Sequence, residues 1–206
     1  MTPELAALAV HDLKNALGVL EGQLLAMEAA PTAHQARSAR AHCEQLRREL
    51  VAFLTLYRDE GLCAQVADES PYAFLNSLVR TRELQGSTND RVTLNVNSQA
   101  IGPVFWYFDA RLVRLALDAA VHNALRFARA NVVLQAARRG DWLVLSVSDD
   151  GPGLSATLNA HDAWSTGLGT ALCRAVAKAH RNGDREGEVR LFDSAQGGAC
   201  FELVLP

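Results

Sequence analysis

Four short segments of the chain contain residues that could carry phosphoryl or nucleotide chemistry. The first is HDLKNAL, which begins at His11. A neutral imidazole can accept a phosphoryl group, because one ring nitrogen attacks while the other needs a proton acceptor to fix its tautomer. Asp12 is placed to be that acceptor, and Asn15, one helical turn beyond His11, could position a water molecule near the phosphoryl group. The alternative is that His11 is simply one polar residue on a solvated helix face.

The second segment is DAAVHNALRFA, residues 118–128, which has a helical pattern. Asn is a poor residue for a helix interior, so Asn123 either bonds to a neighbouring turn or has a chemical task. Its amide oxygen could bind hydrated Mg²⁺, a cation that prefers oxygen ligands. Arg126 could contact a phosphate, and Phe127 could pack on a nucleoside.

The other two segments contain glycines. In SDDGPGL, Asp149 could accept a hydrogen bond from an exocyclic amine, while Gly151 and Gly153 could let the backbone pass close to a planar base. In STGLGTAL, Gly167 and Gly169 stand where a helix begins, and free N–H groups at a helix N-terminus suit an anion such as phosphate. Each segment alone is also a common turn. The four segments together, in this order, indicate a phosphoryl-transfer or nucleotide site more specifically than any one of them.

Two helical patterns precede the rest of the chain. Apolar residues recur at steps of three to five up to about Ala30, and Pro31 then breaks the pattern. Thr32 is a plausible N-cap for a second helix that ends near Gly61. Two helices joined by so short a loop form an antiparallel hairpin. Because a hairpin exposes an apolar stripe, we expect it to pair with a second copy into a four-helix bundle.

The pattern changes after residue 61. Residues 64–70 are expected to be a linker, and beyond them helical and alternating periods are mixed. The helical stretches are 72–84, 110–128 and 168–179, and the strand-like stretches are 92–96, 104–108, 131–137, 142–148, 188–192 and 199–205. This order predicts an α+β sandwich with one sheet covered by helices.

Composition narrows the class of protein. The 206 residues have a net charge of -3, which gives no electrostatic reason to expect nucleic acid or an anionic membrane as a partner. No apolar run is long enough to span a bilayer, and the start does not have the pattern of a signal peptide. The four cysteines are scattered, as expected of reduced thiols in a cytoplasmic protein.

Taken together, the segments resemble the conserved core of two-component histidine kinases over nearly the whole chain. HDLKNAL resembles the H-box of that family, HNALRFA the N-box, SDDGPG the G1 box and STGLGTALCRAVAKAH the G2 box. The ending SAQGGACFELVLP resembles the last hairpin of the family. The resemblance implies a dimerisation and phosphotransfer hairpin at residues 1–62. It also implies an ATP-binding domain of the Bergerat type at residues 68–206.

The resemblance also implies roles for individual residues. His11 would be autophosphorylated from ATP with Mg²⁺, Asp12 would assist, and the phosphoryl group would pass to an Asp of a response-regulator receiver domain. Asn15 matches the position linked in the family to dephosphorylation of the regulator. The nucleotide would be bound by Asn123, Arg126, Phe127, Asp149, Gly151, Gly153, Gly167 and Gly169, with Asn123 also holding Mg²⁺.

The sequence departs from the family pattern at several places. Ala16 replaces the proline of the H-box, so the first helix is expected to be straighter. Ala119 replaces an earlier Asn of the N-box, and Ser165 replaces the first glycine of G2. Only residues 154–164 separate the glycine boxes, which predicts a short lid and weaker ATP binding. We expect no sensor domain ahead of His11, so that the signal either comes from a partner, such as an upstream sensor or kinase, or is not received by this protein.

Two other functions fit the same residues. A histidine phosphotransferase would relay phosphoryl groups between receiver domains without ATP, as the short lid and the altered N-box favour. A non-enzymatic scaffold would bind a regulator through the helical bundle. The autophosphorylating kinase remains our prediction, since most of the nucleotide-binding residues are present.

Overall fold

The computed structural model describes residues 3–29, 31–57, 62–84, 92–97, 102–154, 167–194 and 197–206. The chain divides into two compact units. One is built on the residues up to Gly61 and also takes in the segment that ends at Leu172. The remainder of the chain forms the other unit.

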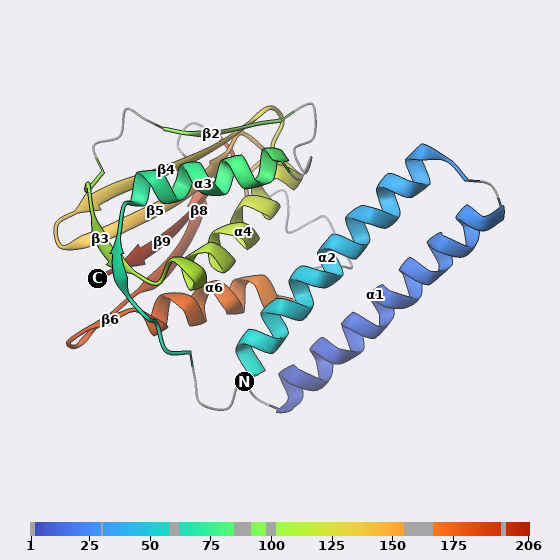
Figure 1. Cartoon of the computed structure of the whole chain (residues 1–206), viewed down its shortest axis with the longest axis horizontal. Coiled ribbons are helices and arrows are strands. Elements are labelled where there is room, and N and C mark those ends of the chain that lie inside the picture. The colour runs from blue at the N-terminus through green and yellow to red at the C-terminus, as the bar shows by residue number, and fades with distance from the viewer. Residues whose placement is uncertain are drawn as a thin grey trace. The chain divides into compact units, whose positions relative to one another are not determined.

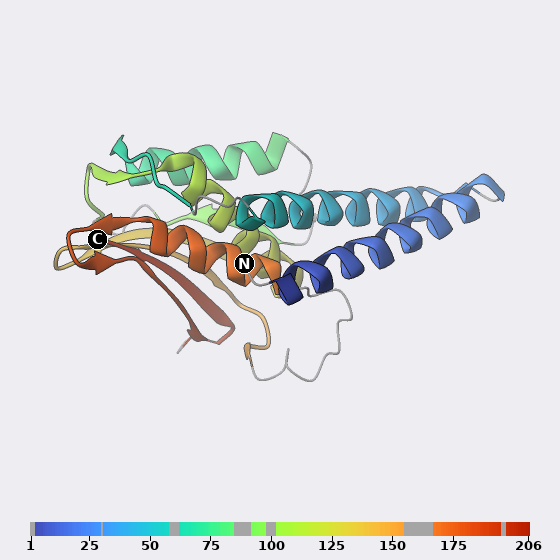
Figure 2. The same cartoon turned by 90° about the horizontal axis from the view of Figure 1, so that it is seen from below.

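The first unit contains the predicted helical hairpin. Its helices are α1 (Pro3–Ala29) and α2 (Ala33–Tyr57), which lie side by side and antiparallel in Figures 1 and 2. Thr32 caps α2, because its hydroxyl oxygen accepts from the Gln35 N–H at 3.1 Å and donates to the Gln35 side chain at 2.8 Å. The predicted N-cap is therefore confirmed. The predicted end of the second helix near Gly61 lies outside the described residues.

Small residues and one polar cluster join the two helices. Ala9 of α1 and Ala39 and Ala52 of α2 are buried. Gln23 of α1 bonds to the His42 ring at 2.8 Å and to the Ser38 hydroxyl at 3.4 Å. No described helix is both long enough and apolar enough to cross a membrane.

The second unit is built on a five-stranded sheet with strand order β2-β4-β5-β9-β8. Its strands are β2 (Thr93–Val96), β4 (Asn131–Arg139), β5 (Trp142–Asp149), β8 (Glu188–Asp193) and β9 (Ala199–Leu205). β2 is parallel to β4, and all other neighbours are antiparallel. The helices α3 (Pro71–Leu84) and α4 (Ala110–Phe127), together with the part of α6 (Leu168–Ala179) from Cys173 on, cover one face of the sheet (Figures 1 and 2). The predicted α+β sandwich is confirmed.

Alternating residues of the central strands form the core beneath these helices. In β5, Leu143, Leu145 and Val147 are buried and pair in register with residues of β9 on the same face. From the helix side, α4 contributes Val113 and Leu117, neither of which is accessible to solvent. The sheet face and the helix stripe therefore close one hydrophobic core, which holds the turn after β5 in place.

Two short pairings were not predicted. The expected linker at 64–70 contains β1 (Ala67–Glu69), which pairs antiparallel with β3 (Trp106–Phe108). The linker prediction was therefore wrong at these three residues. β6 (Arg181–Asn182) and β7 (Arg185–Glu186) form a small hairpin after α6. Strands of two or three residues are too short to show an alternating pattern, so the sequence did not indicate them.

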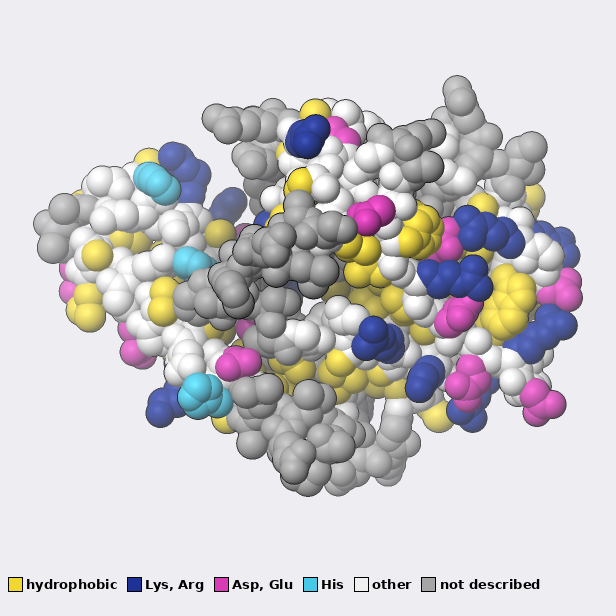
Figure 3. Space-filling view, turned by 180° about the vertical axis from the view of Figure 1, so that it is seen from behind, with side chains coloured by type: hydrophobic (Ala, Val, Ile, Leu, Met, Phe, Trp, Pro, Cys, Tyr) yellow, Lys and Arg dark blue, Asp and Glu magenta, His cyan; other side chains and the backbone are white. Residues whose placement is uncertain are grey.

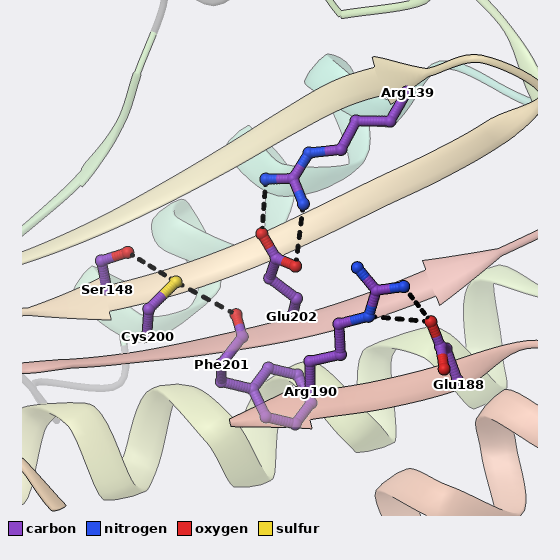
Figure 4. Close-up of polar contacts among 7 residues, drawn as sticks. All are labelled: Arg139, Ser148, Glu188, Arg190, Cys200, Phe201 and Glu202. Atoms are coloured by element: carbon purple, nitrogen blue, oxygen red, sulfur yellow. Dashed lines mark hydrogen bonds and ion pairs between the residues drawn. The ribbon is translucent and has the colours of Figure 1, made fainter. Parts of the chain in front are cut away.

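The other face of the sheet carries both polar and apolar side chains. Figure 3 views the molecule from this side, and hydrophobic side chains there lie among basic and acidic ones. Glu202 of β9 is only 2% exposed, and Arg139 of β4 binds its carboxylate through two hydrogen bonds of 3.0 and 2.6 Å (Figure 4). Beside it, the Ser148 hydroxyl donates to the Cys200 sulfur at 3.2 Å. A buried carboxylate needs such a partner, so Arg139 stabilises the centre of the sheet.

Candidate functional site

The structure gathers the three residues of the predicted phosphoacceptor site on one turn of α1. His11 is exposed, and its Nδ1 lies 3.2 Å from the side-chain nitrogen of Asn15. An oxygen of Asp12 lies 3.6 Å from the same Nδ1. Asp12 therefore stands beside the ring nitrogen where a proton acceptor was expected. Asn15, however, makes the direct hydrogen bond.

An open, mainly apolar pocket adjoins His11. It is lined by Ala6, Val10 and Lys14 of α1 and by Phe53 and Tyr57 of α2. The rings of Phe53 and Tyr57 are stacked, with centroids 5.4 Å apart. Both aromatic residues lie on α2, and nothing in the sequence associated them with His11. The pocket gives His11 an apolar wall with one cationic side chain, Lys14.

α1 continues without a break through Ala16. An alanine here keeps the backbone N–H that a proline would remove. The helix therefore holds His11 and Asn15 at their i, i+4 spacing, which places both side chains on one face.

Asp149 ends β5, and its carboxylate is oriented by the backbone. Its Oδ1 accepts hydrogen bonds from the N–H of Gly151 at 2.8 Å and from that of Ala199 at 3.2 Å. Its Oδ2 forms no hydrogen bond with any residue in the described part of the chain. One oxygen is thus fixed, and the other remains able to accept a donor such as an exocyclic amine.

The two glycines after Asp149 are required by close backbone contacts. A Cβ on Gly151 would lie 2.5 Å from the carbonyl oxygen of Phe127, at the end of α4. Gly153 has a φ of +85°, in the region that favours glycine. Next to it, the N–H of Leu154 donates to Asp193 at 2.6 Å. In the structure these glycines bring the turn against α4 and β8.

Asp150 has a structural role that sequence reasoning missed. Its carboxylate accepts hydrogen bonds of 2.8 to 3.1 Å from the backbone N–H groups of Arg129, Ala130 and Asn131. Desolvation raises the pKa of Asp150, but these backbone donors outweigh it and lower the pKa to about 2. Asp150 therefore ties the turn between α4 and β4 to the turn after β5.

α4 carries the remaining residues of the predicted N-box. Asn123 is exposed, and no hydrogen bond with another described residue occupies its side chain. Its amide oxygen is available, so it fits a hydrated Mg²⁺, which needs only one or two protein ligands. The guanidinium of Arg126 lies 5.4 Å from the ring centroid of Phe127, which is partly buried. The ring therefore already has one face occupied by a cation.

Gly167 and Gly169 stand at the start of α6, as predicted. Gly167 has a φ of +69°, and its carbonyl accepts from the Ala171 N–H at 3.0 Å, so it precedes the first helical residue. Gly169 lies in the first turn, whose N–H groups have no partner within the helix. Ser165 and nearly all of the predicted lid lie outside the described residues.

The opposite end of α6 is fastened to the start of α4 by a buried histidine. Nε2 of His180 accepts from the backbone N–H of Asp109 at 3.0 Å, and its Nδ1 donates to the Val176 carbonyl at 2.7 Å. Asp109 is also the N-cap of α4. Burial lowers the pKa of His180, which keeps the ring in the neutral form that this pair of bonds requires.

Comparison with known proteins relates the chain to signalling kinases. Residues 108–206 match the family described as histidine kinase-, DNA gyrase B-, and HSP90-like ATPase. The sensor protein KdpD of Escherichia coli strain K12 is 30% identical over 224 residues, which cover 98% of this chain and 24% of KdpD. The sensor histidine kinase CpxA of the same strain is 32% identical over 119 residues, covering 51% of this chain and 25% of CpxA. The chain thus spans about a quarter of the length of these relatives.

Solved structures share the fold. The Acinetobacter baumannii histidine kinase AdeS has a TM-score of 0.66 at 21% identity, covering 95% of this chain and 96% of AdeS. The histidine kinase ThkA, in complex with the response regulator protein TrrA, has a TM-score of 0.69 at 14% identity, covering 99% of this chain and 61% of ThkA. At these identities the likeness concerns the fold alone. The family match and the related sequences support a two-component histidine kinase with a GHKL-type ATPase domain, which is matched at residues 108–206.

Proposed function

We propose that the chain is a protein histidine kinase that transfers the γ-phosphoryl group of ATP to His11 and then to an Asp of a response-regulator receiver domain. The observation that carries this proposal is the cluster on α1. There an exposed His11 has Asp12 and Asn15 beside its Nδ1, in a chain that also contains the ATPase domain.

Phosphorylation of His11 requires one nucleophilic ring nitrogen and one proton acceptor at the other ring nitrogen. Nε2 of His11 forms a bond to the γ-phosphorus as the bond from that phosphorus to the bridging oxygen breaks, and ADP leaves. The proton on Nδ1 passes toward the Asp12 carboxylate, which limits the positive charge on the ring. Transfer onward to a receiver Asp reverses the first step and restores the imidazole.

The nucleotide-binding roles follow the resemblance. Asp149 would accept a hydrogen bond from the adenine amine, and Asn123 would hold Mg²⁺, whose charge offsets that of the phosphates. Arg126 and the N–H groups that follow Gly167 would contact phosphate oxygens, with Phe127, Gly151, Gly153 and Gly169 shaping the site. A structure of the same fold, that of full-length ShkA, contains AMPPNP, with a TM-score of 0.60 at 23% identity; the match covers 100% of this chain and 46% of ShkA.

A homodimer through the hairpin belongs to the same proposal. Val10, Leu17 and Leu24 of α1 are all about half exposed and recur every seven residues. Leu50, Leu54 and Tyr57 of α2 are similarly exposed. A hairpin cannot bury such stripes by itself, whereas a second copy can. The ThkA structure, which contains a response regulator, supports the same kind of partner for this chain.

A labelling experiment tests the proposal. Purified protein is incubated with γ-labelled ATP and Mg²⁺, and we expect acid-labile, base-stable label that is absent from His11→Ala. In Asp149→Asn, the amide oxygen can still accept from Gly151 and Ala199, but the remaining position becomes a donor. That variant should lose both the label and the ATP-induced rise in melting temperature. Asp68→Asn, an exposed change on β1, should keep both. A wild-type chain without label, or full labelling of His11→Ala, would refute the kinase.

The phosphotransferase alternative has less in its favour. The related sequences named above are sensor proteins, and the family match covers an ATPase domain. A phosphotransferase would be labelled only by a phosphorylated receiver domain. A scaffold would bind the regulator without any transfer of label.

A further inference from the structure

Two side chains on α1 compete for a single ring nitrogen. Nδ1 of His11 lies 3.2 Å from Nδ2 of Asn15 and 3.6 Å from Oδ1 of Asp12. An amide nitrogen can only donate a hydrogen bond. Nδ1 must therefore be the acceptor in its bond with Asn15, and it carries no proton in this arrangement.

The tautomer that Asn15 selects is the wrong one for catalysis. A neutral imidazole has one protonated nitrogen, so a ring that accepts at Nδ1 has its proton on Nε2. A protonated Nε2 has no lone pair with which to attack phosphorus. Asp12, a carboxylate, selects the opposite tautomer, because it can only accept a proton from Nδ1. The two neighbours of His11 thus favour opposite states of the nucleophile.

We propose that Asn15 is a positioning residue that holds His11 in the inactive Nε2–H tautomer until Asp12 takes its place at Nδ1. This inference rests on the proposed kinase function. On exchange, Nε2 releases its proton to water and Nδ1 takes up a proton, which it then shares with Asp12. Nε2 can now attack the γ-phosphorus while the bond to the ADP oxygen breaks. The Nδ1 proton moves to Asp12, leaving a neutral phosphohistidine.

The local geometry suits an exchange of partners. The side chain of His11 is 66% exposed and that of Asp12 is 34% exposed, so both are accessible to solvent. Asp12 is within 1 Å of the usual hydrogen-bond distance, so a small rotation of the side chains is enough. Because Nδ1 has one lone pair or one proton, it cannot satisfy both neighbours at once.

The tautomer of His11 can be measured directly. The full chain is prepared with ¹⁵N-labelled histidine, and long-range ¹⁵N–¹H NMR spectra are recorded at about pH 8.5, where imidazoles are neutral. His11→Ala identifies the His11 signals among the six histidines. We expect the wild-type ring to be in the Nε2–H form and Asn15→Ala to shift it toward Nδ1–H. Asn15→Leu, similar in size but unable to donate, should behave as Asn15→Ala does.

Autophosphorylation is then measured without any regulator, so that dephosphorylation of a partner does not enter. Asn15→Ala should be labelled about two- to tenfold faster than wild type, the population change that one hydrogen bond gives. A wild-type ring already in the Nδ1–H form, or a tautomer unchanged by Asn15→Ala, would overturn the inference. A chain that shows the tautomer shift but takes no label in any variant would refute the kinase instead.

Discussion

At the scale of residues, the turn after β5 depends on carboxylates that bind backbone N–H groups. Asp149 accepts from Gly151 and Ala199, and Asp150 accepts from three successive residues at the α4–β4 turn. Charge-assisted bonds of this kind are stronger than neutral ones. The two neighbouring aspartates therefore have different partners: Asp149 orients its carboxylate on the turn after β5, and Asp150 ties that turn to the one between α4 and β4.

Replacement of Asp150 should destabilise the second unit in a pH-dependent way. Asp150→Ala removes hydrogen bonds to three solvent-exposed backbone donors, which should cost about 1 kcal/mol in the free energy of unfolding at pH 7. The folded pKa of about 2 lies below the ordinary value of 3.8. The contribution is therefore complete above about pH 3.8 and is lost as the pH falls toward 2. Urea unfolding of both proteins at pH 7 and at about pH 3 measures the difference.

The control for that prediction is Asp68→Ala, which removes an exposed aspartate on β1. Its unfolding free energy should differ from wild type by less than about 0.5 kcal/mol at either pH. An Asp150→Ala protein as stable as this control at pH 7 would show that the backbone bonds contribute nothing.

At the scale of elements, the start of α4 is held by polar contacts with segments distant in the sequence. Asp109 caps its first turn, accepting from Arg111 and Leu112, and also accepts from the N–H of Gln65 at 2.9 Å. His180, at the end of α6, accepts from the backbone N–H of the same Asp109. The start of α4 is thus the point where a connecting segment and another helix meet.

This junction should respond to acid through His180. Burial lowers its folded pKa below the ordinary 6.5, so the unfolded chain binds the proton first. Stability is therefore complete above about pH 6.5 and falls as the pH decreases, by at most about 1.4 kcal/mol per pH unit. His180→Gln, which cannot titrate, should lose this dependence in denaturant titrations between about pH 7.5 and 5.5. His34→Gln, at an exposed position of α2, should retain it.

The sequence predicted long elements well and polar contacts poorly. The bounds of α6 and the hairpin turn at Thr32 were predicted, because each depends on neighbouring residues. The roles of Asp150 and His180 could not be predicted, since their partners lie about 20 and 71 residues away in the chain. At His11, the spacing of the residues pointed to Asp12 and Asn15 as its neighbours, and their functional roles stay predictions. The competition of Asp12 and Asn15 for Nδ1 of His11 could be recognised only from the distances between their atoms in the structure.

At the scale of the whole molecule, assembly should depend on the exposed stripes of the hairpin. Leu17→Glu combined with Leu54→Glu places charges in both stripes, where the second copy would bury them. We expect this double variant to be monomeric in light scattering after gel filtration, while wild type is dimeric. Leu84→Glu, at an exposed leucine of α3, should remain a dimer. A wild-type monomer at micromolar concentration would contradict the proposed homodimer.

The edges of the sheet also affect how molecules can associate. β2 and β8 are the edges of the five-stranded sheet, where unpaired backbone groups could recruit a strand from another molecule. β2 has only four residues, and β8 carries charges at Glu188, Arg190 and Asp193 on either side of its exposed Leu191 and Phe192. Short or charged edges oppose aggregation. The short edge β2 and the charged edge β8 therefore disfavour pairing of the sheets of two molecules. At high protein concentration, molecules can then pair through their helices without forming fibres.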